Sequence, residues 1–95
     1  MTNILESRIE KHLDETVKKM GGFTRKTVYQ GRKAAPDRQV FLPGGIIWFV
    51  ELKRPGEKPR RDQEAELELL RKNGFKVAVI DTMLGVDVWA EDARC

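Results

Sequence analysis

The stretch that most constrains the fold is Ile46-Ile47-Trp48-Phe49-Val50-Glu51-Leu52-Lys53. Its apolar residues are mostly β-branched or aromatic, which predicts a buried strand. Such a strand has no ordinary structural use for a carboxylate and an ammonium group two positions apart at its end. Side chains alternate across a strand, so Glu51 and Lys53 are expected on one face, with the carbonyl group of Leu52 between them in the backbone. We therefore take the end of this strand as the candidate site.

A turn signal, Pro43-Gly44-Gly45, precedes this strand and predicts a hairpin with a less regular strand over residues 37–42. Pairing Leu42 with Ile46 across the turn fixes the register of the hairpin. Counting outward along both strands then places Asp37 opposite Glu51. The hairpin therefore brings a second carboxylate to the candidate site.

Two carboxylates in a cross-strand pair have Cβ atoms about 5 Å apart, and they repel unless a cation lies between them. The oxygens of Asp37 and Glu51, with the carbonyl oxygen of Leu52, suit a hard divalent cation. Zinc fits less well, because its sites use clusters of cysteine and histidine and the sequence contains one of each. The pattern predicts a Mg²⁺ or Mn²⁺ site.

The length of 95 residues predicts a single domain over residues 1–95, with one modest core. So small a domain has little surface for a second function, and oligomerisation would add area. The single cysteine, Cys95, favours a reducing, intracellular setting. The sequence contains no apolar stretch of membrane-spanning length and no signal-peptide core, so we expect a cytoplasmic protein without membrane contact.

Basic residues are unevenly distributed, although the net charge is only +3. Residues 23–36 hold four basic residues and no acidic one, and residues 53–61 hold five basic residues and one acidic one. Solvated basic loops would explain either run alone. Both runs flank the candidate site, which favours a phosphate-binding surface. The predicted DNA-binding residues are Arg25, Lys26, Arg32, Lys33, Arg38, Arg54, Lys58, Arg60 and Arg61.

The N-terminal segment is predicted to form an amphipathic helix. Apolar residues recur every three or four positions over residues 5–20, and Gly21-Gly22 ends the pattern. Asn3 and Glu6 resemble a capping box. Glu10 lies at the edge of the apolar arc, where a carboxylate needs a polar partner, either at the candidate site or in a surface ion pair.

A second helix is predicted over residues 59–73, with Pro59 in its first turn and Gly74 as its stop. Gln63 shares a face with two leucines, so its side chain is expected to point inward toward the sheet. The acidic residues are expected on the outer face of this helix: Glu64, Glu66 and Glu68.

Two further strands are predicted over residues 23–29 and 75–80, and a basic loop over residues 30–35. Pro36 stiffens the backbone that enters Asp37, which suits a ligand. The last segment, residues 81–95, is compatible with a short strand over residues 86–90 or with a short helix.

This order of features resembles the PD-(D/E)xK nuclease superfamily, whose α/β core is a restriction-endonuclease-like mixed sheet flanked by helices. A closer resemblance is to the stand-alone virus-type replication and repair nuclease (VRR-NUC) domains of phages and bacteria. A Glu-x-Lys motif is frequent by chance, but the preceding Pro-Asp and the following inward glutamine make the pattern specific. The likeness rests on Gly21-Gly22, Pro36-Asp37-Arg38, Leu42-Pro43-Gly44-Gly45, Phe49-Val50-Glu51-Leu52-Lys53 and residues 60–63 before a helix.

The resemblance implies metal-assisted hydrolysis of a phosphodiester bond. Lys53 would orient or deprotonate the attacking water, or offset charge in the transition state. Glu10 would assist metal or water binding, and Gln63 would orient Lys53 or the phosphate. The predicted catalytic residues are Glu10, Asp37, Glu51, Lys53 and Gln63, and the predicted metal ligands are Asp37, Glu51, Leu52 and Glu10.

The function that we expect is structure-specific cleavage of DNA, as a Holliday-junction resolvase that acts as a homodimer in a phage or bacterial setting. The alternatives are a non-catalytic basic module for DNA binding or dimerisation, and a flap, nicking or restriction-type endonuclease with the same metal centre. An apolar excess fits a two-fold interface or simple burial: Trp48, Phe49, Phe75 and Trp89.

Overall fold

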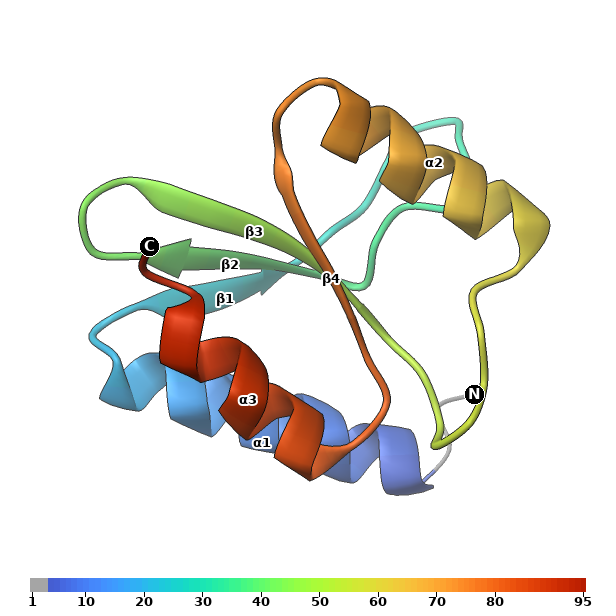
Figure 1. Cartoon of the computed structure of the whole chain (residues 1–95). Coiled ribbons are helices and arrows are strands. Elements are labelled where there is room, and N and C mark those ends of the chain that lie inside the picture. The colour runs from blue at the N-terminus through green and yellow to red at the C-terminus, as the bar shows by residue number, and fades with distance from the viewer. Residues whose placement is uncertain (1–3) are drawn as a thin grey trace.

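The computed structural model describes residues 4–95 and contains one mixed sheet with helices on both of its faces. The sheet has four strands in the order β1-β2-β3-β4, antiparallel between β1, β2 and β3 and parallel between β3 and β4. Helices α1 and α3 cover one face, and α2 lies on the opposite face (Figure 1). This arrangement confirms the expected α/β class. The elements are α1 (Ile4–Lys19), β1 (Phe23–Lys26), β2 (Arg38–Leu42), β3 (Ile46–Leu52), α2 (Arg61–Lys72), β4 (Lys76–Ile80) and α3 (Met83–Asp92).

The register of the β2–β3 hairpin is the predicted one. Leu42 pairs with Ile46, and Arg38 pairs with Val50. Continuing this register by one residue brings Asp37 opposite Glu51. The parallel pairing of β3 with β4 requires a crossover, which α2 supplies from the end of β3 to the start of β4.

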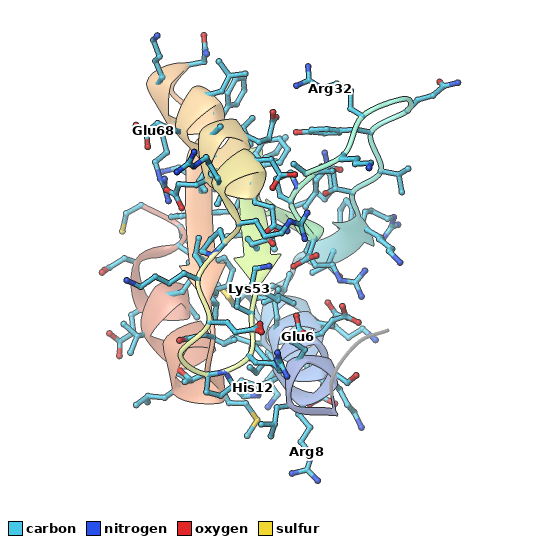
Figure 2. The ribbon with its side chains drawn as sticks, turned by 90° about the vertical axis from the view of Figure 1, so that its right-hand side faces the viewer. Glu6, Arg8, His12, Arg32, Lys53 and Glu68 are labelled. Carbon is cyan, nitrogen blue, oxygen red and sulfur yellow. The ribbon has the colours of Figure 1, made fainter. Side chains whose placement is uncertain are left out.

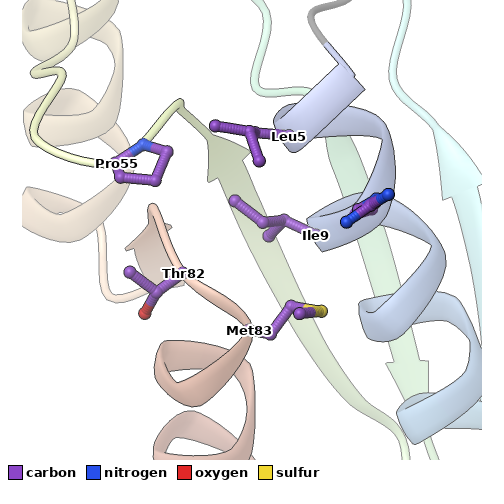
Figure 3. Close-up of a pocket in the computed structure, with 6 residues that line it drawn as sticks. Leu5, Ile9, Pro55, Thr82 and Met83 are labelled. Atoms are coloured by element: carbon purple, nitrogen blue, oxygen red, sulfur yellow. The ribbon is translucent and has the colours of Figure 1, made fainter.

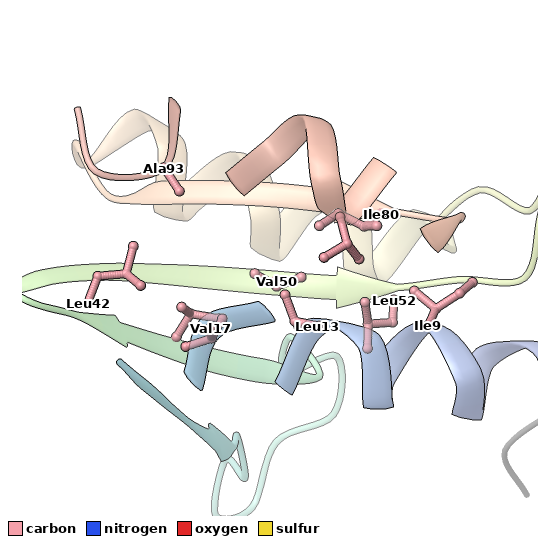
Figure 4. Close-up of a cluster of buried hydrophobic side chains, with 10 residues drawn as sticks. Ile9, Leu13, Val17, Leu42, Val50, Leu52, Ile80 and Ala93 are labelled. Carbon is pink, nitrogen blue, oxygen red and sulfur yellow. The ribbon is translucent and has the colours of Figure 1, made fainter. Parts of the chain in front are cut away.

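The hydrophobic core lies between the sheet and the α1–α3 layer (Figure 4). The predicted apolar stripe of α1 contributes Ile9, Leu13 and Val17, all buried. They pack against strand residues on the same face, such as Val50, and against α3 residues, such as Val86. Because side chains alternate across a strand and Val50 and Leu52 fill this face, Glu51 of β3 points to the other face.

The segment that the sequence left undecided is the helix α3. Thr82 is its N-cap, and its Oγ1 accepts a 2.8 Å hydrogen bond from the backbone nitrogen of Gly85. The helix buries Val86 against the core, and Trp89 packs edge-on against Trp48 with 5.8 Å between ring centroids. Burial within one chain thus accounts for both tryptophans.

The predicted boundaries need two corrections. Helix α2 begins at Arg61, so Pro59 lies before the helix, because Gln63 Oε1 accepts a 2.9 Å hydrogen bond from the Arg60 nitrogen and fixes Arg60 as the N-cap. Strand β1 ends at Lys26, because its partner β2 begins only at Arg38 and leaves no strand to continue the ladder.

Two expectations concern the N-terminal segment and the membrane. The predicted capping box depends on Asn3, which lies outside the described residues. Among residues 4–95, no helix is both long enough and apolar enough to cross a bilayer.

Candidate active site

The candidate site lies at one edge of the sheet, where β2 begins and where β3 and β4 end. The backbone nitrogen of Lys53 donates a 3.0 Å hydrogen bond to the carbonyl oxygen of Ile80, which extends the β3–β4 ladder by one residue. Lys53 therefore stands at the end of a fixed strand. In the view of Figure 2, Lys53 projects between α2 and α1, and the charges of Lys53 and of Glu6 in α1 both act on Asp37.

The backbone of Leu52 links the two predicted carboxylate ligands. Its amide donates a 2.7 Å hydrogen bond to Asp37 Oδ2. The N–H and C=O groups of a strand residue point to the same side, so the Leu52 carbonyl also faces the strand that begins after Asp37. Glu51, the residue before Leu52, shares this strand end. The structure thus brings Asp37, Glu51 and the Leu52 carbonyl together at one edge.

Glu51 is a buried carboxylate, with 1% of the residue exposed. Burial, followed by the nearby charge of Asp37, raises the pKa of Glu51 to about 7. Burial also raises the pKa of Asp37, although the hydrogen bond from Leu52 and the charge of Lys53 act in the opposite direction. The charge of Asp37 therefore makes the ionised form of Glu51 less favourable, which is the conflict that a bound cation would relieve.

Lys53 partly compensates this negative charge. Its Nζ lies 3.2 Å from Glu51 Oε2, and its side chain is 12% exposed. The two side chains therefore share a face, as predicted. The contact has the distance of an ion pair without the direction of a hydrogen bond, so Glu51 Oε2 is a buried oxygen with no hydrogen-bond donor among residues 4–95.

The donor set fits a hard divalent cation. It combines two carboxylates with a backbone carbonyl, and one carboxylate oxygen is buried without a hydrogen-bond donor. Within the described part of the chain, no cluster of three or more histidine, cysteine, aspartate or glutamate residues could hold a metal. A cation at this site would therefore need the carbonyl and water or substrate oxygens to complete its coordination.

Known proteins provide an independent comparison. No protein-family model matches the chain. A protein named "Putative nuclease p44", from Acyrthosiphon pisum secondary endosymbiont phage 1, is 49% identical over 82 residues, which cover 86% of this chain and 88% of that protein. A solved structure described as a VRR_NUC domain superposes with a TM-score of 0.91 at 41% identity, covering 95% of this chain and 98% of the other.

The chain belongs to the VRR-NUC family. The resemblance found in the sequence is thereby confirmed, and so is the nuclease core that it implied. Membership of this family identifies the chain as a nuclease domain.

Glu10 forms the ion pair that the sequence offered as its alternative role. Its Oε1 lies 3.0 Å from Arg38 Nη2, and Asp14 Oδ2 lies 3.6 Å from the same nitrogen. Glu10 is also near enough to Asp37 for its charge to raise the pKa of Asp37. Arg38 therefore ties α1 to the start of β2, next to the site of this VRR-NUC domain.

Gln63 is buried, as predicted, with 8% of the residue exposed. Its Oε1 accepts the hydrogen bond from the Arg60 nitrogen at the start of α2. This contact gives Gln63 a structural role at the helix N-terminus. Its predicted effect on Lys53 or on a phosphate remains a prediction.

Eight of the nine predicted DNA-binding residues are exposed. The exception is Arg38, whose side chain is 17% exposed because it pairs with two carboxylates of α1. Arg54 and Arg60 pair with the neighbouring Glu57 and Asp62. The exposed cations lie in the two segments that flank the candidate site in the sequence, and their contact with DNA stays a prediction.

Glu66 does not lie on the outer face of α2, where the sequence placed it. Its Oε2 accepts a 2.9 Å hydrogen bond from the hydroxyl group of Tyr29, and its side chain is 11% exposed. Glu68 does lie on the outer face, near Arg71. No periodicity within α2 could reveal this difference, because the partner of Glu66 comes from a loop 37 residues earlier.

A hollow of about 150 Å³ lies between the first turns of α1 and α3 (Figure 3). Leu5, Ile9, Pro55 and Met83 give it an apolar lining, and among residues 4–95 Arg8 is its only charged lining residue. No carboxylate of the described residues lines it, so they supply no acid, base or metal ligand to the nuclease reaction from this hollow.

Proposed function

We propose that this VRR-NUC domain is a Mg²⁺- or Mn²⁺-dependent endonuclease that hydrolyses phosphodiester bonds in DNA. The observation that carries the proposal is the pairing of Asp37 and Glu51 at one sheet edge, with Lys53 Nζ 3.2 Å from Glu51 Oε2. An acidic pair of one buried and one half-buried carboxylate, with one ammonium group, is costly for folding. It is suited to holding a cation beside an anionic substrate.

The metal ligands in this proposal are Asp37, Glu51 and the carbonyl oxygen of Leu52, with Glu10 assisting through metal or water. When bound, the cation would polarise the scissile phosphate and lower the pKa of a bound water. The hydrogen bond from Leu52 to Asp37 holds one ligand in place before binding. Such preorganisation reduces the rearrangement needed when substrate arrives.

Lys53 has two alternative tasks in this proposal. Its side chain is largely shielded from solvent, and the strand end fixes its backbone. As an ammonium group it would orient the attacking water or offset negative charge as the pentacovalent transition state forms, and only as a neutral amine would it accept the proton of that water. Both tasks require the position that the Glu51 ion pair and the β3–β4 ladder give it.

We further propose that the active form is a homodimer that resolves four-way DNA junctions. The surface that we assign to the second copy is a row of apolar side chains, which crosses the sheet on the face that carries α2. Pairing aligns Phe23 with Phe41 and Phe41 with Ile47, and the same register continued reaches Phe75. The exposed fractions are 50% for Phe23, 43% for Ile47 and 55% for Phe75.

This apolar row fits a copy of the chain better than it fits DNA. None of its four residues carries a charge that would attract phosphate, whereas a two-fold contact would bury the row against itself. The row lies four residues along the strands from Asp37 and Glu51, which is about 13 Å. Both sites of a dimer would therefore stay open to the arms of a junction.

Two measurements test the proposal. Purified protein is offered a four-way junction, a flap and a linear duplex, each with Mg²⁺, Mn²⁺ or a chelator. We expect metal-dependent incision of opposing strands, with the junction preferred. Light scattering is expected to return twice the 10.9 kDa mass of one chain. A monomer mass would contradict the dimer, equal cleavage of junction and duplex would contradict the substrate, and inactivity on all substrates with both metals would contradict the reaction.

A further inference from the structure

The loop between β1 and β2, residues 27–37, leaves the sheet at the edge that carries the candidate site. At its base, the Thr27 nitrogen donates a 3.2 Å hydrogen bond to the carbonyl oxygen of Asp37. The loop holds two exposed cations, Arg32 and Lys33. Its base is therefore anchored beside a predicted metal ligand, while its tip carries charge suited to a phosphate.

The tip of this loop is held to α2 by two side chains. The hydroxyl group of Tyr29 donates a 2.9 Å hydrogen bond to Glu66 Oε2, and Arg32 Nη2 lies 3.8 Å from Glu66 Oε1. Burial, with the hydrogen bond to Glu66 as the next cause, raises the pKa of Tyr29 to about 12. The hydroxyl group therefore remains a donor at every pH at which the protein would work.

Without this attachment the loop has few reasons to keep one conformation. It contains no regular structure, and Ala34 has a φ of +71°, which is uncommon for a residue other than glycine. A groove of about 390 Å³ separates its tip from α2, with Ala65 and Leu69 in the lining. In the described part of the chain, both polar links between the loop and α2 run through Glu66.

We propose that Tyr29 and Glu66 are positioning residues, which fix the loop so that Arg32 and Lys33 contact the phosphate backbone of a DNA strand at the active site. The proposal rests on the proposed function, because it assigns the loop to a DNA substrate. Ordering the loop before binding removes an entropic cost from substrate binding. The attachment of the loop to α2 does not hold the predicted metal ligands, because Asp37 is held separately by the hydrogen bond from Leu52.

Hydrogen–deuterium exchange on the protein without DNA tests the attachment itself. Tyr29→Phe deletes the hydrogen bond without a change of charge and is expected to speed exchange in residues 28–35. Glu66→Gln keeps an acceptor for Tyr29, and Glu66→Ala does not, although both remove the same charge. We expect faster loop exchange in Glu66→Ala than in Glu66→Gln.

A matched pair of controls lies on the opposite side of α2. Glu68 points away from the loop that carries Arg32 (Figure 2), and its Oε2 lies 3.3 Å from Arg71 Nη1. Glu68→Ala and Glu68→Gln are expected to exchange alike in the loop. The proposal would be overturned if the loop of Tyr29→Phe exchanged hydrogen at the wild-type rate. It would also be overturned if the loop exchanged at the same rate in Glu66→Ala and Glu66→Gln.

Steady-state kinetics of DNA cleavage test whether the attached loop promotes substrate binding. Tyr29→Phe is expected to raise KM about fivefold to tenfold, the size of one typical intramolecular hydrogen bond, with kcat within about twofold of wild type. Tyr29→Phe should also weaken the contacts of Arg32 and Lys33 with phosphate. The slope of log binding affinity against log salt concentration is then expected to become shallower by up to about 2. A fall in kcat at unchanged KM would show a merely structural role and contradict the proposal.

The decisive comparison repeats Tyr29→Phe in a chain that already carries Arg32→Ala and Lys33→Ala. There the substitution is expected to leave KM unchanged, because the loop no longer has cations to position. The same rise in KM in both backgrounds would contradict the proposal. If wild-type protein neither binds nor cleaves DNA, the proposed function fails instead, and the exchange experiment still tests the attachment.

Discussion

The backbone amide of Leu52 lies 2.7 Å from Asp37 Oδ2, so one predicted metal ligand orients another. The hydrogen bond runs from β3 to the residue that precedes β2. It lowers the pKa of Asp37, although burial has the larger effect and raises it. This hydrogen bond holds the Asp37 carboxylate beside Glu51, at an electrostatic cost to the folded chain.

Glu51 makes the stability of the metal-free protein depend on pH. Its pKa is raised on folding from 4.5 to about 7, first by burial and then by Asp37. A carboxyl group with a raised pKa binds more protons in the folded state, so stability falls as pH rises from about 4.5 to about 7. The shift corresponds to a loss on the order of 3 kcal/mol.

We expect Glu51→Gln to remove most of this fall. In the presence of a chelator, the melting temperature of the wild type should fall between pH 5 and pH 8 by more than the melting temperature of Glu51→Gln. Adding Mn²⁺ at the higher pH should raise the melting temperature of the wild type and leave that of Glu51→Gln unchanged. Glu68→Gln, on the outer face of α2, serves as the control and should behave as the wild type does. Identical pH profiles for wild type and Glu51→Gln would contradict the raised pKa.

The hairpin could be predicted from sequence because its determinants are local. A turn signal between two apolar runs fixes the pairing of Leu42 with Ile46, and strand alternation then places Asp37 and Glu51 at the same edge. The apolar stripe of α1 could also be predicted from the sequence, because the burial of Leu13 and Val17 follows from their helical spacing.

Contacts between distant segments could not be predicted in this way. The hydrogen bond between Tyr29 and Glu66 spans 37 residues, and no pattern in either segment points to the other. The ion pair of Arg38 with Glu10 likewise depends on how α1 crosses β2. Helix α3 was left undecided between helix and strand although Thr82 is a good N-cap, because its valines also suit a strand.

Gly22 should tolerate no side chain. A Cβ atom there would lie 2.2 Å from the carbonyl oxygen of Phe41, a backbone atom of β2 that has no room to move. We expect Gly22→Ala to destabilise the fold by about 2 kcal/mol or more, measured by urea unfolding. Gly44→Ala, where φ is +90° and no neighbour lies within 4 Å, should cost only about 1–2 kcal/mol of backbone strain. A smaller loss at Gly22 than at Gly44 would contradict this packing.

Arg38 should act through stability more than through DNA affinity. Its guanidinium group is mostly buried between Glu10 and Asp14, so Arg38→Ala leaves two carboxylates without their partner. Because those carboxylates are more than a third exposed, we expect a loss of only about 1–2 kcal/mol in urea unfolding. Lys58→Ala, an exposed cation near the site, is the control and should lower DNA affinity at constant stability. A reversal of these two effects would restore Arg38 as a DNA contact.

The proposed dimer depends on the apolar row of Phe23, Phe41, Ile47 and Phe75. Replacing Ile47 or Phe75 with lysine places a charge on this row and should shift the light-scattering mass toward one chain. Leu84→Lys, at a residue of α3 that is 71% exposed, is the matched control and should keep the wild-type mass. Junction cleavage should fall with the dimer, while nicking of linear duplex persists. Wild-type mass in both row variants would place the interface elsewhere.

The most direct test of the central claim measures DNA cleavage and Mn²⁺ binding on the same samples of wild type, Asp37→Asn, Glu51→Gln and Glu68→Gln. Calorimetric titration with Mn²⁺ reports binding, and cleavage is followed with Mn²⁺ and with a chelator. We predict that wild type and Glu68→Gln bind the metal and cleave, and that the two site variants fold, lose metal affinity and cleave at least about a hundredfold more slowly. Cleavage by the wild type in chelator, or unchanged metal binding and cleavage in both site variants, would contradict the account.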